Sequence, residues 1–203
     1  MFLTKVLWEG DSEFNKNIKV IKSFGLGTYI QVNGLTQSGG IVESIWRQTL
    51  KKLNSKNINA KSILILGLGG GSVVKVIRKY WPEAKITGIE IDPVMIELGK
   101  KYLDLDKYNV DIKIQDARKF LSQISNSNLK SYNLVIVDTY LGNDYVEITG
   151  INPVMSRITV FNRLYFGNKK AGAEKFGKKL ERLFPRVEKF YPPANLMYIC
   201  YNN

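Results

Sequence analysis

Short apolar runs alternate along the chain with segments in which apolar residues recur at helical spacing. The runs at 62–66, 85–91, 110–114 and 132–137 predict four strands. The run at 62–66, rich in Ile and Leu, is typical of a strand that is buried on both faces of a sheet, and the run at 132–137 also predicts a buried strand. Between the first two runs, apolar residues recur at helical spacing as far as Tyr80, and a proline two residues later ends the predicted helix. This alternation predicts an α/β domain with a mostly parallel, twisted sheet.

The N-terminal part of the chain has a different pattern, with short β-prone runs separated by glycine-containing turns. A polar, glycine-rich connection at 33–40 leads from these runs to a predicted helix at 41–53. We therefore divide the chain into a small N-terminal β unit with its connection, 1–40, and a larger domain, 41–203. The predicted strands of the N-terminal unit are 5–8, 18–24 and 28–33.

After the fourth apolar run, the segment from 138 to 157 contains Gly142, Gly150 and Pro153, and we predict a loop there rather than a packed helix. The rest of the chain alternates again between strand and helix patterns, and its last two apolar runs flank a Pro-Pro pair, which predicts a terminal β-hairpin. The predicted elements are a strand at 157–164, a helix at 171–184 and strands at 186–191 and 195–201.

A glycine-rich turn, GLGGGS at 67–72, follows the first apolar strand directly. Glycines let a ligand approach the backbone without meeting a Cβ atom. The helix that starts near Ser72 would point its free N–H groups at this space, which favours a carboxylate or a phosphate. Glu90, at the end of the second strand, is placed to accept both hydroxyls of a ribose. The pattern indicates an adenosyl ligand and suits S-adenosylmethionine better than NAD; the alternative is a structural turn without a ligand.

Two further acids, Asp116 and Asp138, follow the third and fourth predicted strands. In open α/β sheets, ligands bind outside the carboxyl ends of the strands, so we expect Glu90, Asp116 and Asp138 to line one crevice. Each acid has a simpler alternative role. Asp116 could cap the helix that it precedes, Glu90 could be solvated at a strand end, and Asp138 could orient a loop.

The chain has a formal net charge of +12, one cysteine (Cys200) and no histidine. This composition rules out an internal disulfide, a His-based triad and a His/Cys zinc site, so we expect no metal. The basic residues are scattered except for a stripe of Lys175, Lys178, Lys179 and Arg182, so nucleic-acid binding is an option that no motif supports. No apolar run reaches membrane-spanning length, and we expect a soluble, cytoplasmic protein without a membrane partner.

Several motifs follow one another in a characteristic order. NGLTQSGGIVESIW precedes ILILGLGGGS, and IEIDPVMIELGKKYL, IKIQDARKFL and YNLVIVDTY come after it. In this order they resemble the polyamine aminopropyltransferases (the spermidine synthase family) and, through them, the class I S-adenosylmethionine-dependent methyltransferases. The resemblance covers nearly the whole chain. It implies a Rossmann-like methyltransferase fold, a homodimer, and S-adenosylmethionine or its decarboxylated form as co-substrate.

The resemblance also implies roles for individual residues. Glu90 would hold the ribose hydroxyls, Asp116 would accept from the adenine amino group, and Gln37 would approach the nucleoside. Asp138 would be the acid nearest the transferring group. Apart from the resemblance, Trp46 and Tyr140 could form aromatic walls of the site in a methyl transfer, or they could belong to the core. The predicted catalytic residues are Asp138 and Tyr140. The predicted cofactor-binding residues are Gln37, Gly67, Gly69, Gly71, Glu90, Ile91, Asp116 and Ala117.

Several positions depart from the pattern of this family, among them Asn33, which stands where the family has an aspartate. Gly70 stands where the family places an acid inside the glycine turn, and Leu141 replaces the second aspartate after the catalytic strand. An aspartate and a tyrosine of the Gln37 segment become Val42 and Trp46. A diamine is a dication with ammonium pKa values near ~10, so binding it requires several carboxylates. These replacements argue against plain putrescine as the acceptor.

Three functions remain open on the sequence. In the first, the protein binds S-adenosylmethionine, its decarboxylated form or methylthioadenosine, and moves a methyl or aminopropyl group to an unidentified small molecule. In the second, it is a true polyamine aminopropyltransferase in which Asp144 or Glu147 replaces the missing acid. In the third, it is a non-catalytic protein that keeps the nucleoside site for regulation or dimer assembly. RNA methylation is a weaker alternative, and an NAD-dependent dehydrogenase is the weakest because the chain has no histidine.

Overall fold

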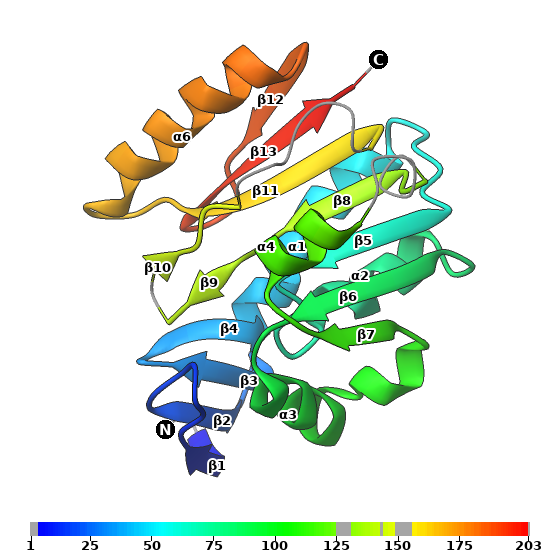
Figure 1. Ribbon diagram of the computed structural model, residues 1–203. Helices are drawn as coiled ribbons and strands as arrows, with labels where there is room; N and C mark the ends of the chain where they lie inside the picture. Colours follow the sequence, from blue (N-terminus) through cyan, green and yellow to red (C-terminus); the bar gives the residue numbers. More distant parts are fainter. Residues whose placement is uncertain (1–3, 125–130, 143, 149–155, 203) are drawn as a thin grey trace.

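The computed structural model describes residues 4–124, 131–142, 144–148 and 156–202. A seven-stranded sheet in the order β12-β13-β11-β8-β5-β6-β7 forms the centre of this part of the chain (Figure 1). Strand β13 runs antiparallel to both of its neighbours, and the other neighbouring pairs are parallel. The predicted parallel sheet and terminal hairpin are therefore confirmed. The strands are β5 (Ser62–Leu66), β6 (Lys85–Glu90), β7 (Asp111–Ile114), β8 (Leu134–Val137), β11 (Ile158–Leu164), β12 (Arg186–Phe190) and β13 (Asn195–Tyr201).

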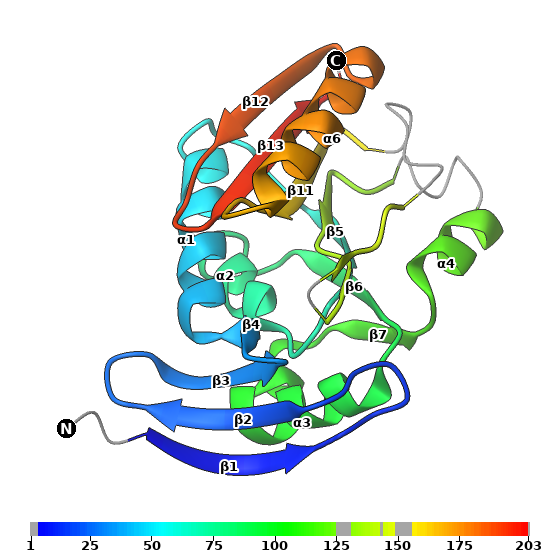
Figure 2. The same ribbon diagram turned by 90° about the vertical axis from the view of Figure 1, so that its left-hand side faces the viewer.

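Helices cover both faces of the sheet, as the continuous apolar strands require. Strand β5 illustrates this, because Ile63 and Ile65 belong to the core beneath α1 and α2, while Leu64 and Leu66 belong to the core beneath α4 and α6 (Figures 1 and 2). The helices are α1 (Gly40–Asn54), α2 (Ser72–Tyr80), α3 (Pro93–Leu103), α4 (Ala117–Gln123) and α6 (Lys169–Leu183), with a 3₁₀ turn η1 (Leu105–Tyr108) after α3. No helix in the described ranges is long and apolar enough to cross a membrane.

The N-terminal unit is a four-stranded antiparallel sheet, with one strand more than predicted. The segment interpreted as a connection contains β4, which pairs with β3 through Val32 and Leu35. The reason is the turn between them, because Asn33 and Gly34 have φ values of 49° and 79°. Two such residues form the tight turn that suits a β-hairpin. The strands are β1 (Thr4–Gly10), β2 (Ile18–Ser23), β3 (Gly27–Val32) and β4 (Leu35–Gly39).

The N-terminal sheet packs against α3 through its own small core (Figure 2). This core is one hydrophobic cluster, which contains Ile18, Val20 and Ile30 of the sheet together with Met95 and Leu98 of the helix. Helix α3 follows directly after β6, so this packing holds the N-terminal unit beside the carboxyl ends of the central strands. The N-terminal unit is therefore in a position to cover the crevice that forms there.

The segment after β8 is not a plain loop. Tyr140–Leu141 (β9) and Asp144–Tyr145 (β10) form a short antiparallel pair. Gly142, with a φ of 55°, turns the chain between them. Gly150 and Pro153, on which the loop prediction also rested, lie outside the described residues.

Candidate active site

The turn after β5 meets the end of β8, and this contact explains the first glycine of the turn. Gly67 has a φ of 84°, and a Cβ atom at this position would collide with the carbonyl group of Asp138. Only glycine permits both the backbone conformation and the close approach. The carboxyl ends of β5 and β8 are thereby brought together, at the point where the strand order reverses.

The N–H groups of the glycine turn already have acceptors within the protein. Gly69 N donates to Glu90 Oε2 at 2.7 Å, and Gly70 N donates to Ser38 Oγ at 2.8 Å. Gly71 N donates to a carbonyl oxygen of the turn itself at 3.0 Å. The N–H groups of Gly69, Gly70 and Gly71, which were expected to bind a carboxylate or a phosphate, are therefore occupied by hydrogen bonds within the protein.

Glu90 is half-buried by surface area, and its carboxylate lies deep enough for burial to raise its pKa. Its Oε1 atom accepts from the Asp92 N–H group at 3.0 Å, while Oε2 accepts from Gly69, and both bonds counteract part of this shift. A carboxylate oxygen can accept more than one hydrogen bond. Glu90 can therefore still accept from the hydroxyl groups of a ligand, as the ribose prediction requires.

Asp138, at the end of β8, lies between two donors. Trp46 Nε1 donates to Oδ2 at 3.2 Å, and Asn162 Nδ2 donates to Oδ1 at 2.9 Å. Burial raises the pKa of Asp138 to about 6, although the bonds from Asn162 and Trp46 lower it. Asp138 is thus mostly ionised at neutral pH and is more basic than an exposed aspartate, which suits a residue that accepts a proton.

Tyr140 lines the site, but its hydroxyl group is hydrogen-bonded to the backbone of β11. The Tyr140 oxygen accepts from the Leu164 N–H group at 2.9 Å and donates to the Asn162 carbonyl oxygen at 3.3 Å. Burial raises the pKa of Tyr140 above its usual range. The contacts fit the predicted aromatic wall better than a role for the hydroxyl group in proton transfer.

Asp116 does cap the helix that it precedes, and it also lines the site. Its Oδ1 atom accepts from the Arg118 N–H group at 2.7 Å at the start of α4. Hydrogen bonds and the ion pair with the Arg118 guanidinium hold the pKa of Asp116 below its usual range. The capping role and the predicted contact with adenine are compatible, because a carboxylate oxygen accepts more than one hydrogen bond.

The N-terminal unit closes the site with hydrogen bonds made by Ser12, Asn15 and Gln37 that the sequence did not suggest. Ser12 Oγ and Asn15 Nδ2 both donate to Asp92 Oδ2, at 2.5 and 2.6 Å, and Asp92 is fully buried. Asn15 Oδ1 also accepts from Gly142 N at 3.1 Å, while Gln37 Nε2 donates to Gly142 O at 2.8 Å. The N–H group and the carbonyl group of Gly142 are therefore both hydrogen-bonded to the N-terminal unit.

These groups surround one pocket, which has about 890 Å³ of empty space when the solvent at its mouth is included. Glu90, Asp116 and Asp138 all line it, which confirms that the three acids converge. Gly71 does not line it, because a Cβ atom there would face Leu105 instead. The other predicted residues that line the pocket are Gln37, Gly67, Gly69, Ile91, Ala117 and Tyr140.

The acids proposed as replacements for the missing carboxylate are not at the site. Asp144 is exposed and pairs with Lys169 at 3.0 Å, and Glu147 pairs with Lys179 at 3.0 Å on α6. Neither acid lines the pocket. Gly70 does not line it either, since a Cβ atom there would lie 2.7 Å from Ile30 Cδ1. Among the described residues, no three His, Cys, Asp or Glu side chains form a group that could hold a metal ion.

Sequence reasoning missed three polar residues of the site, namely Asn15, Ser38 and Asn162. Asn162 had a detectable signal, because it is a polar residue at the end of the mainly apolar run ITVFN of β11. A polar side chain in a buried strand requires a hydrogen-bond partner. Asn15 and Ser38 lie in polar stretches and had no such signal.

The family model of the spermine/spermidine synthase domain matches residues 47–165, which is more than half of the chain. The chain belongs to the spermine/spermidine synthase family. This family includes a polyamine aminopropyltransferase of Clostridioides difficile that is 30% identical over 143 residues. The match covers 68% of this chain and 49% of that relative, so the chain spans about half of the relative's length.

Solved structures of spermidine synthases have the same fold. The enzyme from Thermotoga maritima gives a TM-score of 0.75 at 18% identity, over 98% of this chain and 73% of that chain. A spermidine synthase in complex with the transition state analogue AdoDATO gives a TM-score of 0.72 at 18% identity, over 98% of this chain and 74% of the other. The predicted Rossmann-like methyltransferase fold is confirmed by these matches.

Proposed function

We propose that the protein transfers the aminopropyl group of decarboxylated S-adenosylmethionine to an amine. The observation that carries the proposal is the buried carboxylate of Asp138, in a pocket that two more acids line. Membership of the spermine/spermidine synthase family supports it, as does the name of the bacterial relative. A methyl transfer, which the sequence left open, has less support because the relative is named an aminopropyltransferase.

The charges of the pocket favour a cationic ligand. A sulfonium carries a positive charge, and carboxylates in a crevice of low dielectric attract it. Among the described lining residues the one basic side chain is Arg118, which is already paired with Asp116. A ligand carboxylate would therefore find neither an unpaired cation nor an unused N–H group at Gly69 or Gly70. This favours the decarboxylated form over S-adenosylmethionine itself.

The proposed orientation of the nucleoside follows from the positions of the acids. Glu90 would accept from the ribose hydroxyls, and Asp116 would accept from the adenine amino group beside the Ala117 backbone. The sulfonium would then lie on the side of the pocket near Asp138, Gln37 and Tyr140. A spermidine synthase of the same fold has been solved in complex with the transition state analogue AdoDATO, which supports an adenosyl ligand for this chain.

Transfer would be a displacement at the carbon bound to sulfur. The amine nitrogen forms an N–C bond while the C–S bond breaks, and the electron pair of that bond leaves with the sulfur of methylthioadenosine. An amine arrives as an ammonium ion with a pKa near ~10, so it must first lose a proton. Asp138 would accept this proton and pass it to solvent. Holding the reacting atoms close together supplies much of the remaining catalysis.

The test is calorimetric binding of decarboxylated S-adenosylmethionine, S-adenosylmethionine and methylthioadenosine, followed by an assay of methylthioadenosine release with a panel of amines. We expect the decarboxylated form to bind at least ~10-fold tighter than S-adenosylmethionine, and Asp138→Asn to keep binding but lose transfer. Tighter binding of S-adenosylmethionine would overturn the choice of co-substrate in favour of methyl transfer. If none of the three ligands binds to the protein, the proposed transfer is refuted and a non-catalytic role remains.

A further inference from the structure

A second pocket adjoins the proposed nucleoside pocket and shares part of its wall. Gln37, Val42, Asp138 and Tyr140 line both. A molecule in the second pocket would therefore meet the first ligand beside the Asp138 carboxylate. On the proposed function, the second pocket is the place from which an acceptor amine reaches the sulfonium, so its lining determines which amines are accepted.

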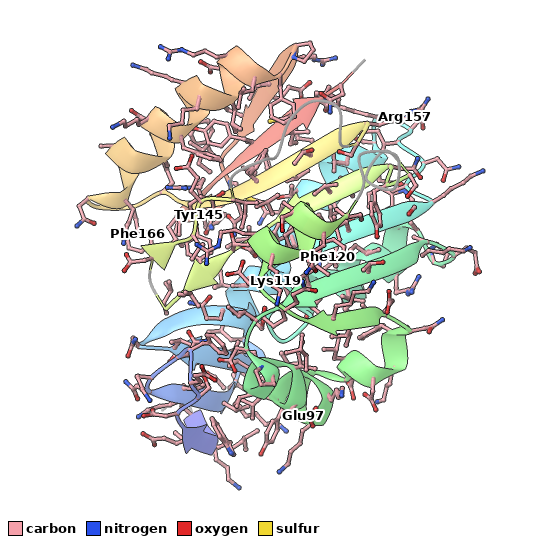
Figure 3. All side chains as sticks on the ribbon, viewed as in Figure 1. Glu97, Lys119, Phe120, Tyr145, Arg157 and Phe166 are labelled. Carbon is pink, nitrogen blue, oxygen red and sulfur yellow. The ribbon has the colours of Figure 1, made fainter. Side chains whose placement is uncertain are left out.

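The lining of this pocket is mainly apolar. It comes from β4 and α1, from the end of β11 and from the turn before β13, around about 680 Å³ of empty space that includes the open mouth. The apolar lining residues are Leu35, Ile41, Val42, Ile45, Leu164, Phe166, Pro193 and Ala194. Ile41 and Phe166 are 43% and 42% exposed, so they lie where the pocket opens to solvent. Figure 3 labels Phe166, which follows the end of β11.

Asp138 is the one charged side chain among the described residues that line this pocket. The segments outside the described ranges cannot supply another acid, because their sequences contain no Asp or Glu. The other polar side chains of the lining are uncharged, namely Thr36, Gln37, Tyr140, Asn162 and Asn195. A diamine would place one ammonium group at Asp138 and the other in this lining without a counterion. Burial of an ammonium without a partner is strongly unfavourable.

From this lining we infer that the acceptor is a primary monoamine with an apolar chain. Its amino group lies at Asp138, and its alkyl or arylalkyl chain runs between Ile45 and Leu164 toward Phe166. This inference rests on the proposed function and names the substrate class of the same site. Since each buried methylene contributes about 0.8 kcal/mol, kcat/KM should rise ~4-fold per added methylene until the pocket is filled.

The sharpest comparison is between pentylamine and putrescine, which have the same number of heavy atoms and differ in one terminal group. We expect pentylamine to give a kcat/KM at least ~100-fold higher than putrescine in the assay of methylthioadenosine release. Calorimetric binding of both amines to the protein saturated with methylthioadenosine should give the same order. Tighter binding of putrescine, or no binding of either amine, would overturn the inference.

The binding experiment separates this inference from the proposed function. Pentylamine could bind more tightly than putrescine while no methylthioadenosine is released from the decarboxylated co-substrate. In that case the inferred specificity of the pocket stands and the proposed transfer activity is refuted. If methylthioadenosine is released with putrescine as readily as with pentylamine, the transfer activity stands and the inferred specificity is wrong.

A variant at the mouth of the pocket tests the missing charge directly. Ile41 lies in the first turn of α1 and is partly exposed, so Ile41→Asp is compatible with folding, and an acid there also suits the helix N-terminus. We expect this variant to raise the ratio of diamine to monoamine kcat/KM at least ~10-fold. Phe24→Asp replaces an exposed apolar residue that does not line the pocket, and it should leave the ratio unchanged. An unchanged ratio in Ile41→Asp as well would contradict the inference.

Discussion

Replacement of Asp138 by asparagine removes the charge that burial disfavours, and the effect on stability should depend on pH. The folded protein has an Asp138 pKa of about 6, above the value of ~3.9 for an exposed aspartate. The folded state therefore binds this proton more tightly than the unfolded state. The contribution of Asp138 to stability is fully present below about pH 4 and is lost as the pH rises through 6.

The size of the effect follows from the difference between the two pKa values. A shift of about 2 units corresponds to ~3 kcal/mol, of which roughly 2 kcal/mol is lost between pH 4 and pH 8. The asparagine variant has no titrating group at this position. The free energy of unfolding of the wild type minus that of Asp138→Asn should therefore fall by about 2 kcal/mol from pH 4 to pH 8.

The measurement is urea unfolding of both proteins, followed by tryptophan fluorescence at pH 4, 5, 6, 7 and 8. The difference between the two proteins cancels the titration of Glu90, whose pKa burial also raises in both. Asp144→Asn, which removes an exposed carboxylate from the same segment, serves as the reference. A difference that stays flat or grows with pH would refute the raised pKa of Asp138 and, with it, the proposed base.

Two other substitutions test single hydrogen bonds of the site. Trp46→Phe removes a bond that lowers the pKa of Asp138, so the acid limb of the kcat/KM profile should move upward by up to about one pH unit. Trp81→Phe removes an N–H group that bonds a backbone carbonyl elsewhere, and it should leave the profile in place. Ser38→Ala leaves the buried N–H group of Gly70 without its acceptor, so the free energy of unfolding, measured in urea, should fall by about 1–3 kcal/mol. A loss below ~0.5 kcal/mol would show that this bond does not hold the turn.

The sequence alone determined the elements of the central domain. Strand β5 was predicted with the bounds that it has, and helix α2 with a start near Ser72 and an end before Pro82, because apolar periodicity reports which faces of a segment are buried. The turn between them was also predictable, since a run of glycines signals a conformation that other residues rarely adopt. β4 was predictable too, because Asn33-Gly34 is a strong hairpin signal, but its polar composition was interpreted as a connection.

Only the tertiary structure decided the partners within the site. Ser38 accepts from Gly70, and Trp46 and Asn162 flank Asp138, although these residues lie far apart in the chain. Periodicity is a local property, whereas a hydrogen-bond partner depends on which elements pack side by side. The same holds for the basicity of Asp138 and for the apolar lining of the second pocket, because both depend on everything that surrounds a group. No single segment of the sequence contains that information.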